Sequence, residues 1–322
     1  MSLRKIVTEY SGIEHSFPYF VARDEGYFAE EGLEVELVRS RDGLLSGAIR
    51  RNVEFESDHN LVSSFQGGGG QAFETGKASL YRACEWGQVR RSYDSGIGAQ
   101  VSFKRSNVGT QAIIVRADSP YNIPQDLADV PIGVNMHHGS HYVAIQSLEG
   151  FLEPQEIKIV NAGGPEKRFE DLRQGRIDAV AIMEPWVTVA EKLGYKIIVE
   201  AHYAGLEVAS PDLDAETFAA INRAISKAAK KLTANPYPYL HYLIEQVPPE
   251  IVTLTPADFN RNRLRFVDPA LYSQKDFERS YRWMVKWNLI GNDAGFQKLV
   301  DSRFETGIIP STDAGASALG VN

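Results

Sequence analysis

The sequence is poor in cysteine: Cys84 is the single one among 322 residues. A lone cysteine excludes an internal disulfide, so the fold does not require an oxidising compartment. A free cysteine is commonly a small buried residue, but a thiolate beside a protonated histidine is a nucleophile. The sequence therefore leaves Cys84 open as a core residue or a catalytic one.

Long apolar stretches are also missing. No run reaches the roughly 18–20 apolar residues that a membrane-spanning helix needs. Residues 1–4 lead straight into an expected strand, without the apolar segment of a secretion signal. We expect no membrane span. We also expect a periplasmic location if a leader precedes the chain and is removed, and a cytoplasmic location otherwise.

Positive charge is outnumbered. There are 34 Lys and Arg residues against 42 Asp and Glu, which gives a net charge of −8. This balance argues against nucleic acid as the main partner. Hydrophobic residues make up 43% of the chain and charged residues 24%, which indicates a large core rather than disorder. The length suits one large α/β unit or two lobes.

The chain is organised around a strand, a turn, a helix and a second strand near its start. Residues 5–9 predict the first strand, and residues 33–38 alternate apolar and polar as a half-buried strand does. Between them we predict a helix over residues 19–32, with Ser16 as its cap and Pro18 in its first turn. The loop before this helix lies at the carboxyl edge of the sheet, where α/β proteins bind small ligands.

This stretch also carries a resemblance. Residues 20–35, FVARDEGYFAEEGLEV, resemble the signature A-x-x-x-G-[YF]-F-x-x-E-G-L-x-V of periplasmic binding proteins. Residues 118–134 and 296–304 resemble later segments of the same pattern, with Asp129-Val130-Pro131 where the family often has Lys-Gly-Lys. The most similar group is the NMT1/THI5-like family, with the nitrate, taurine and aliphatic-sulfonate binders of ABC transporters. The resemblance covers about residues 4–304, except residues 40–64.

The resemblance implies a two-lobed α/β fold, the periplasmic-binding-protein type II fold, with a ligand cleft between the lobes. Lobe 1 would comprise residues 1–103 and 205–322, and lobe 2 residues 104–204. A repeated layout agrees with two lobes: a glycine, a base and a short strand lead to Glu85-Trp86 in one copy and to Glu184-Pro185-Trp186 in the other. We expect the two Glu-Trp corners to face each other across the cleft.

Strand ends and loops supply the candidate ligand-binding residues. The loop at residues 135–142 faces the ligand in the family, and a glycine run before a helix, as at residues 67–70, can present backbone N–H groups to an anion or be a plain flexible loop. The candidates are Tyr10, Ser11, His15, Gly69, Gly70, Glu85, Trp86, His137, His138, Ser140, His141, Tyr142, Glu184 and Trp186.

Histidines are concentrated in the expected loops. Five of the seven are His15, His59, His137, His138 and His141. His137 and His141 are four residues apart, but Gly139-Ser140 is expected to cap the helix, so the two would not share a helix face and we predict no metal site. His59 falls in the charged segment 40–64, which we interpret as a solvated surface excursion or, alternatively, a flap over the cleft.

Two functions remain open at this point. The first is a solute-binding protein that captures a small aromatic, heteroaromatic or zwitterionic acid and delivers it to an ABC permease, without a cofactor. The second is a cytoplasmic decarboxylase, desulfinase or hydrolase of an aromatic acid that uses Cys84, Glu85 and His138. The family's desulfinase places its cysteine in the first loop, where this chain has Ser11 to Ser16, so that site does not carry over.

Overall fold

The computed structural model describes residues 3–40, 69–95 and 100–307. Its strands form two mixed sheets. The first sheet has the order β12-β4-β10-β3-β1-β2, in which β1 is parallel to β2 and β3, while β10 and β12 are antiparallel to their neighbours. Its strands are β1 (Arg4–Tyr10), β2 (Leu33–Arg39), β3 (Leu80–Cys84), β4 (Val101–Lys104), β10 (Gly205–Ala209) and β12 (Ala270–Leu271).

The second sheet has the order β11-β5-β8-β6-β7, and β9 pairs with β5 as well. Strands β6, β7 and β8 are parallel, whereas β5 is antiparallel to β8, β9 and β11. Its strands are β5 (Asn107–Val115), β6 (Pro131–Val134), β7 (Lys158–Asn161), β8 (Ala179–Ile182), β9 (Lys196–Tyr203) and β11 (Arg265–Phe266).

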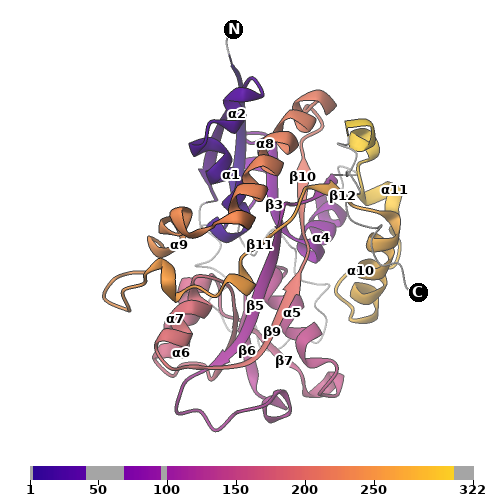
Figure 1. Cartoon of the computed structure of the whole chain (residues 1–322). Helices are drawn as coiled ribbons and strands as arrows, with labels where there is room; N and C mark the ends of the chain where they lie inside the picture. The colour runs from indigo at the N-terminus through magenta and orange to yellow at the C-terminus, as the bar shows by residue number, and fades with distance from the viewer. Residues whose placement is uncertain (1–2, 41–68, 96–99, 308–322) are drawn as a thin grey trace, which may run out of the picture.

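Two short crossings connect the sheets. Arg105 and Ser106 join β4 to β5, and Ala204 joins β9 to β10. The two crossings lie side by side, because the backbone N–H of Arg105 donates to the carbonyl of Gly205 at 3.0 Å and Gly109 pairs with Tyr203 across β5 and β9. Figure 1 shows the pair β5 and β9 leading from the first sheet into the second. A residue at these crossings therefore lies next to both sheets.

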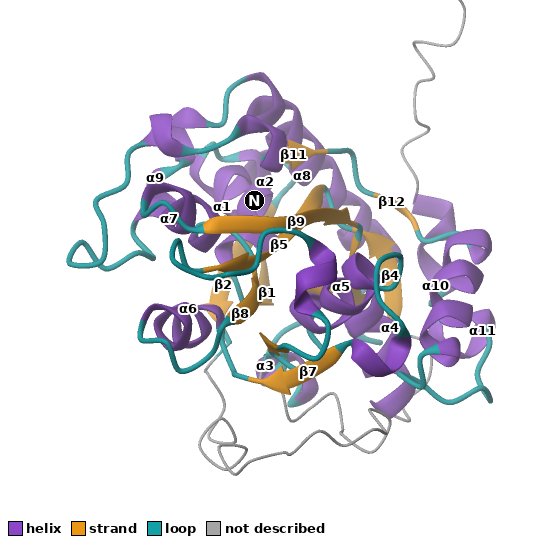
Figure 2. Ribbon diagram, turned by 90° about the horizontal axis from the view of Figure 1, so that it is seen from below, coloured by secondary structure: helices purple, strands orange, loops and turns teal. Residues whose placement is uncertain are grey.

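Helices cover both faces of each sheet. Ala112 and Ile114 of β5 face one hydrophobic cluster with α6, α7, α1 and α8, while Ile113 and Val115 face a second cluster with α5 and α4. Figure 2 shows α6 and α7 on one side of the second sheet and α5 on the other. The helices are α1 (Ile13–Asp24), α2 (Tyr27–Glu30), α3 (Gln71–Glu74), α4 (Glu85–Ser95), α5 (Gly139–Leu148), α6 (Pro165–Arg173), α7 (Trp186–Lys192), α8 (Ala215–Ala234), α9 (His241–Ile244), α10 (Gln274–Lys286) and α11 (Phe296–Leu299). Short 3-10 turns lie at η3 (Pro124–Leu127), η4 (Pro154–Glu156), η5 (Tyr237–Tyr239), η6 (Pro256–Asp258), η7 (Arg261–Arg263) and η8 (Ser302–Gly307).

The first helix differs from its prediction. It begins at Ile13 rather than after Ser16, and it ends at Asp24, where Gly26 in the left-handed region separates it from α2. Pro18 therefore lies inside the helix and cannot donate to the carbonyl of Glu14. The Asn107 side chain donates to that carbonyl instead, at 2.8 Å. A residue at the start of β5 thus takes over a helical hydrogen bond, which ties α1 to the second sheet.

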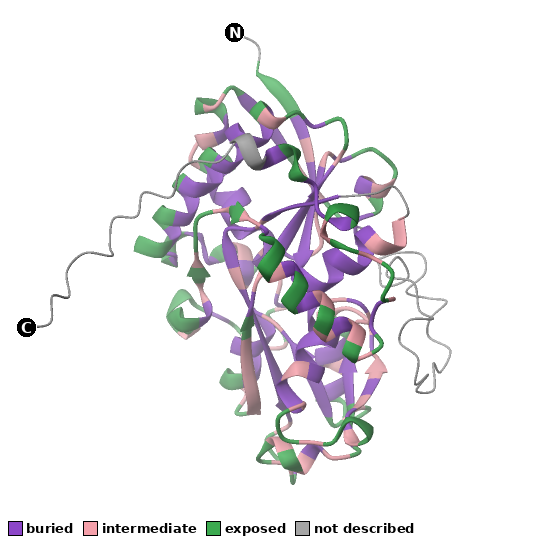
Figure 3. Ribbon diagram, turned by 90° about the vertical axis from the view of Figure 1, so that its right-hand side faces the viewer, coloured by how far each residue is buried: buried purple, intermediate pink, exposed green. Residues whose placement is uncertain are grey.

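Helices outside the first motif follow the sequence more closely. Asp214 caps α8, because its side chain accepts from the backbone of Thr217, and Ser273 caps α10 by accepting from the backbone of Asp276. The central strands and the inward helix faces are buried, whereas strands such as β2 and β9 are partly exposed and the outer helices and turns carry exposed residues (Figure 3). Residues 41–68, including His59 and the glycines at 67 and 68, lie outside the described residues.

Candidate functional site

A buried guanidinium lies at the crossing between the sheets. Arg105 follows β4 and is 4% exposed, yet none of its three guanidinium nitrogens has a hydrogen-bond partner among residues 3–40, 69–95 and 100–307. The ring of Tyr203 lies beside it, with the guanidinium carbon 5.9 Å from the ring centroid. A buried charge without a partner is unfavourable by several kcal/mol in proteins, so such groups normally have a counter-ion or a ligand.

Gly205 makes room for this side chain. A Cβ placed at Gly205 would lie 1.6 Å from Arg105 Nε, which no structure tolerates. The guanidinium therefore fills the space that a side chain on the return crossing would take. Its position depends on two chain segments that are far apart in the sequence.

His15 and Gln111 bring polar atoms to the same place from other elements. His15 of α1 is buried, and its Nε2 lies 3.1 Å from the hydroxyl of Tyr203, while its Nδ1 has no hydrogen-bond partner. Gln111 of β5 donates to the same hydroxyl at 3.4 Å, and its Oε1 is buried without a partner. We call Glu14, His15, Arg105, Gln111 and Tyr203 the crossing cluster.

Burial controls the ionisation of the crossing cluster. It raises the pKa of Glu14 to about 7, although the nearby Arg105 opposes this shift. Burial also lowers the pKa of His15 well below its usual value, and Arg105 lowers it further. The histidine is therefore neutral at neutral pH, and Arg105 carries the positive charge of the cluster.

The predicted loop 135–142 lies against this cluster. A Cβ at Gly139, the first residue of α5, would lie 2.8 Å from the Tyr203 hydroxyl and 2.9 Å from Gln111 Nε2. His138 precedes it as the helix cap and is close enough to His15 to lower the pKa of that histidine. Two of the other predicted residues have internal roles, since Ser140 accepts from the backbone of Asn135 and His141 Nδ1 from the backbone of His137.

Aromatic rings adjoin the cluster. Trp86 is buried, its indole N–H has no hydrogen-bond partner, and its ring centroid is 5.5 Å from that of Tyr203 and 5.8 Å from that of Tyr142. Tyr142 is fully buried and its hydroxyl lies 3.1 Å from His137 Nδ1. Trp86, Tyr142 and Tyr203 thus join the crossing cluster to the start of α5.

The first loop and the glycines form a separate group. Tyr10 packs edge-on against Phe20 with ring centroids 5.1 Å apart. Ser11 and the hydroxyl of Tyr81 both lie against Gly69, because a Cβ at Gly69 would be 3.6 Å from the Ser11 Cβ and 2.6 Å from that hydroxyl. The Gly69 carbonyl accepts from Arg91 at 2.9 Å, and the Gly70 N–H donates to the Ser40 hydroxyl at 3.3 Å. The Gly69 carbonyl and the Gly70 N–H are therefore engaged within the protein.

Glu85 and Cys84 face different surroundings. Glu85 accepts hydrogen bonds from Tyr272, at 2.7 Å, and Ser280, which tie α4 to the C-terminal segment. Cys84 is fully buried, and burial raises the pKa of its thiol to about 12. A thiol with such a pKa is almost entirely protonated at neutral pH, which disfavours a nucleophilic role.

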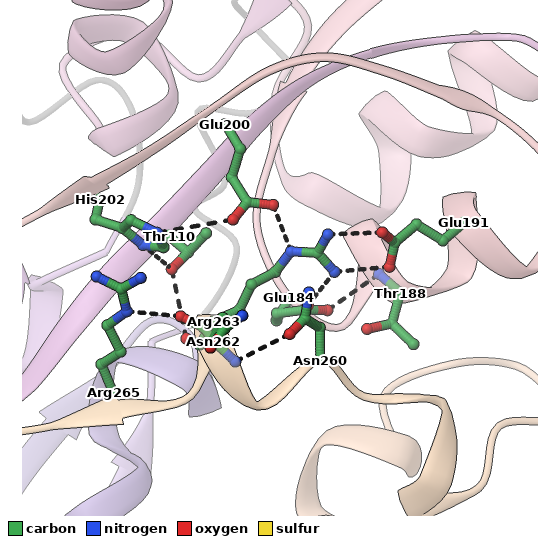
Figure 4. Close-up of polar contacts among 10 residues, drawn as sticks. All are labelled: Thr110, Glu184, Thr188, Glu191, Glu200, His202, Asn260, Asn262, Arg263 and Arg265. Atoms are coloured by element: carbon green, nitrogen blue, oxygen red, sulfur yellow. Dashed lines mark hydrogen bonds and ion pairs between the residues drawn. The ribbon is translucent and has the colours of Figure 1, made fainter.

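The second Glu-Trp corner is held by Arg263. This buried guanidinium contacts three carboxylates: Glu184 at 3.5 Å, Glu191 at 2.7 Å and Glu200 at 2.5 Å. Figure 4 shows Arg263 reaching from the turn η7 to these carboxylates on α7, β9 and the end of β8. Trp186 packs on Phe169, with ring centroids 5.0 Å apart, in a different hydrophobic cluster from Trp86. The two tryptophans therefore do not meet across one site.

No group of histidine, cysteine and carboxylate side chains suitable for a metal ion is found in residues 3–40, 69–95 and 100–307. In the same ranges no helix is long and apolar enough to span a membrane.

Sequence reasoning offered His15 and Trp86 as site candidates but did not offer Arg105, Gln111 or Tyr203. Arg105 follows Lys104, and two adjacent bases normally indicate a solvated turn. The chain returns from the second sheet to the first within residues 197–208. This return was the available signal for Arg105, because a charged residue where two crossings meet cannot reach water freely.

Comparisons with known proteins bear on the fold. The family model described as NMT1/THI5 like matches residues 14–49. No curated protein matches the sequence. Among solved structures, the alkanesulfonate-binding protein SsuA from Xanthomonas axonopodis pv. citri, bound to MOPS, is 13% identical with a TM-score of 0.66, covering 94% of this chain and 98% of its own.

Two further structures are similar. The periplasmic aliphatic sulphonate binding protein SsuA from Escherichia coli is 12% identical with a TM-score of 0.65, covering 94% of this chain and 100% of its own. The desulfurization enzyme DSZB is 14% identical with a TM-score of 0.57, covering 94% of this chain and 98% of its own. The resemblance to the NMT1/THI5-like group is thus confirmed, and the chain has the two-lobed α/β fold of the periplasmic binding proteins.

Proposed function

We propose that this protein captures a small organic anion between two lobes, with Arg105 as the anchor for the acid group. The lobes are those predicted from the sequence, residues 1–103 with 205–322 and residues 104–204. The observation that carries the proposal is the buried guanidinium of Arg105, whose three nitrogens have no hydrogen-bond partner. A guanidinium is planar and suits the paired oxygens of a carboxylate or sulfonate.

The surroundings support an acid with an aromatic body. The ring of Tyr203 lies next to Arg105, and Trp86 and Tyr142 extend this aromatic group. His15 and Gln111 supply polar atoms at the Tyr203 hydroxyl. Aromatic walls with few polar anchors are typical of small-molecule sites. The similar sulfonate-binding proteins make a sulfonate a reasonable first ligand to test.

The positions of the residues in the crossing cluster explain how ligand binding would close the lobes. Arg105 belongs to the crossing, Glu14 and His15 to a helix on the first sheet, and Gln111 and Gly139 to the second sheet and its helix. A ligand that contacts both sides would favour the closed arrangement through these differential contacts. We propose that the closed form delivers the ligand to an ABC permease.

Calorimetric titration tests the proposal. Benzenesulfonate, butanesulfonate and benzoate should bind, whereas uncharged benzamide should not. Arg105→Met should weaken binding at least 30-fold, since a charged hydrogen bond contributes about 2 kcal/mol or more. Arg173→Met, which removes an exposed guanidinium paired with Glu170, is the matched control and should bind normally. Gly205→Ala should weaken binding as well, because it displaces Arg105. Equal affinities of the Arg105→Met variant and the wild type would contradict the proposal.

A second candidate is an enzyme on the same fold, because DSZB has a similar structure. The paired Glu14 and His15 favour it, since a carboxyl whose pKa is about 7 is suited to proton transfer. Mass analysis of each bound anion after incubation separates the two. Recovery of unchanged ligand supports capture, whereas consumption that is lost in Glu14→Gln supports catalysis.

A further inference from the structure

We propose that capture of an organic anion at Arg105 is accompanied by uptake of one proton at Glu14. The inference rests on the proposed function and specifies the charge state in which the crossing cluster holds its ligand. It makes Glu14 the residue that sets the pH range of binding.

Glu14 belongs to the same buried cluster as the guanidinium, through His15 and Tyr203, and interacts with its charge. Its side chain is buried, with Oε2 3.1 Å from His15 Nε2, and the backbone of Thr110 also acts on the carboxyl. Its backbone carbonyl is held by Asn107, two residues after Arg105. The first turn of α1 therefore holds this carboxyl in the buried crossing cluster, rather than in solvent as a first-turn acid normally is.

Charged and titratable groups face Glu14 from every element packed around it. His15 on α1, Arg105 on the crossing, Glu184 after β8 and Tyr203 on β9 act on Glu14 itself. Arg82 on β3 and His138 before α5 act on His15, Cys84 on β3 adjoins Arg105 and Tyr203, and Arg263 on η7 contacts Glu184. Arg82 is paired with Glu207, and Glu184 contacts Arg263. Burial keeps His15 neutral and the Cys84 thiol and Tyr203 hydroxyl protonated near neutral pH. Within the crossing cluster, the charge of Arg105 is therefore balanced by Glu14.

Binding of an anion changes the net charge of the crossing cluster. One guanidinium and one carboxylate sum to zero, so a bound anion would leave one buried negative charge uncompensated. Protonation of Glu14 restores neutrality and converts its oxygen into an O–H donor for the ligand. Burial already raises the pKa of Glu14 to about 7 against the opposing pull of Arg105. When the ligand takes up the charge of Arg105, that pull weakens and the carboxyl holds its proton more tightly.

Titration calorimetry with benzenesulfonate tests this. Benzenesulfonate stays a monoanion throughout the pH range, so it contributes no proton of its own. At pH 8, titrations in two cationic buffers of different ionisation enthalpy should show close to one proton taken up per ligand. At pH 6 the uptake should be close to zero. The dissociation constant should be about tenfold higher at pH 8 than at pH 6, as one-proton linkage to a group of pKa about 7 requires.

Variants of Glu14 and His138 identify the residue that takes up the proton. Glu14→Gln should take up none and bind equally at both pH values, and His138→Gln should keep the uptake of the wild type. Binding by the wild type without proton uptake at pH 8 overturns this inference and leaves the proposed function intact. Uptake that persists in Glu14→Gln also overturns it. If Glu14→Gln does not fold, the uptake by the wild type at pH 8 still decides. Failure of the wild type to bind benzenesulfonate or butanesulfonate at any pH overturns the proposed function itself.

Discussion

Replacing Arg105 by methionine should make the ligand-free protein more stable. A buried guanidinium without a hydrogen-bond partner lowers the stability of the ligand-free protein. Under the proposed function, its partner is the ligand and not another group of the fold. Exchanging buried charged groups for apolar ones of similar size often stabilises a protein by 1–4 kcal/mol. Methionine is flexible and fills irregular space, although its smaller volume subtracts from the gain. We expect the free energy of unfolding to rise by about 1–2 kcal/mol at pH 6.

The pH matters because Arg105 is the counter-charge of Glu14. The raised pKa of Glu14, about 7, means that the folded carboxyl is mostly protonated at pH 6 and mostly ionised at pH 8. A carboxyl whose pKa is raised on folding opposes stability above its unfolded pKa, and more so as pH increases. The gain from Arg105→Met should therefore shrink between pH 6 and pH 8.

Arg82→Met is the matched control. Arg82 is equally buried but is paired with Glu207 at 2.9 Å, so removing it leaves a carboxylate uncompensated and should lower the free energy of unfolding by about 3–5 kcal/mol. Urea denaturation of both variants, followed by circular dichroism, measures the difference. A loss of 1 kcal/mol or more in Arg105→Met at pH 6 would show that Arg105 supports the fold, and would refute the reasoning.

Three further predictions address the rest of the structure. Arg263→Met should lower the free energy of unfolding by about 3 kcal/mol, since it leaves buried Glu184 without its cation, while Arg261→Met on the same turn should change it by under 1 kcal/mol in the same urea titration. Asp214→Ala should lower it by about 1 kcal/mol through loss of the α8 cap; because the pKa of Asp214 is depressed to about 2, this difference should be constant above pH 4 and shrink as pH falls towards 2, and a constant difference would exclude the ionised cap. Cys84 should react with a thiol reagent at neutral pH only as fast as the protein unfolds, and rapid labelling of the native protein would contradict its burial and raised thiol pKa.

The fold was largely predictable because its signals are local. The cap at Asp214, the cap at Ser273 and the alternation of residues 33–38 each depend on neighbours within a few residues. The start of α1 was predicted wrongly because Ser16 and Pro18 form a common helix-start pattern. The chain places them inside the helix, where Arg82 donates to Ser16 and Asn107 replaces the hydrogen bond that Pro18 cannot make.

The site was predictable only in part, because its charges come from crossings rather than from strand ends. His15 and Trp86 follow strands and were found. Arg105 is buried against Gly205 and Tyr203. Both lie far from Arg105 in the sequence, so the sequence gives no local sign of this contact. Trp186 matched Trp86 in spacing, yet it packs on Phe169, because α7 turns its first residue towards α6.

A crystal structure of the protein with benzenesulfonate tests the central claim most directly. We expect a sulfonate oxygen within hydrogen-bond distance of a guanidinium nitrogen of Arg105, with the benzene ring of the ligand beside Trp86 or Tyr203. A sulfonate bound away from Arg105, with that guanidinium still lacking a partner, would contradict it.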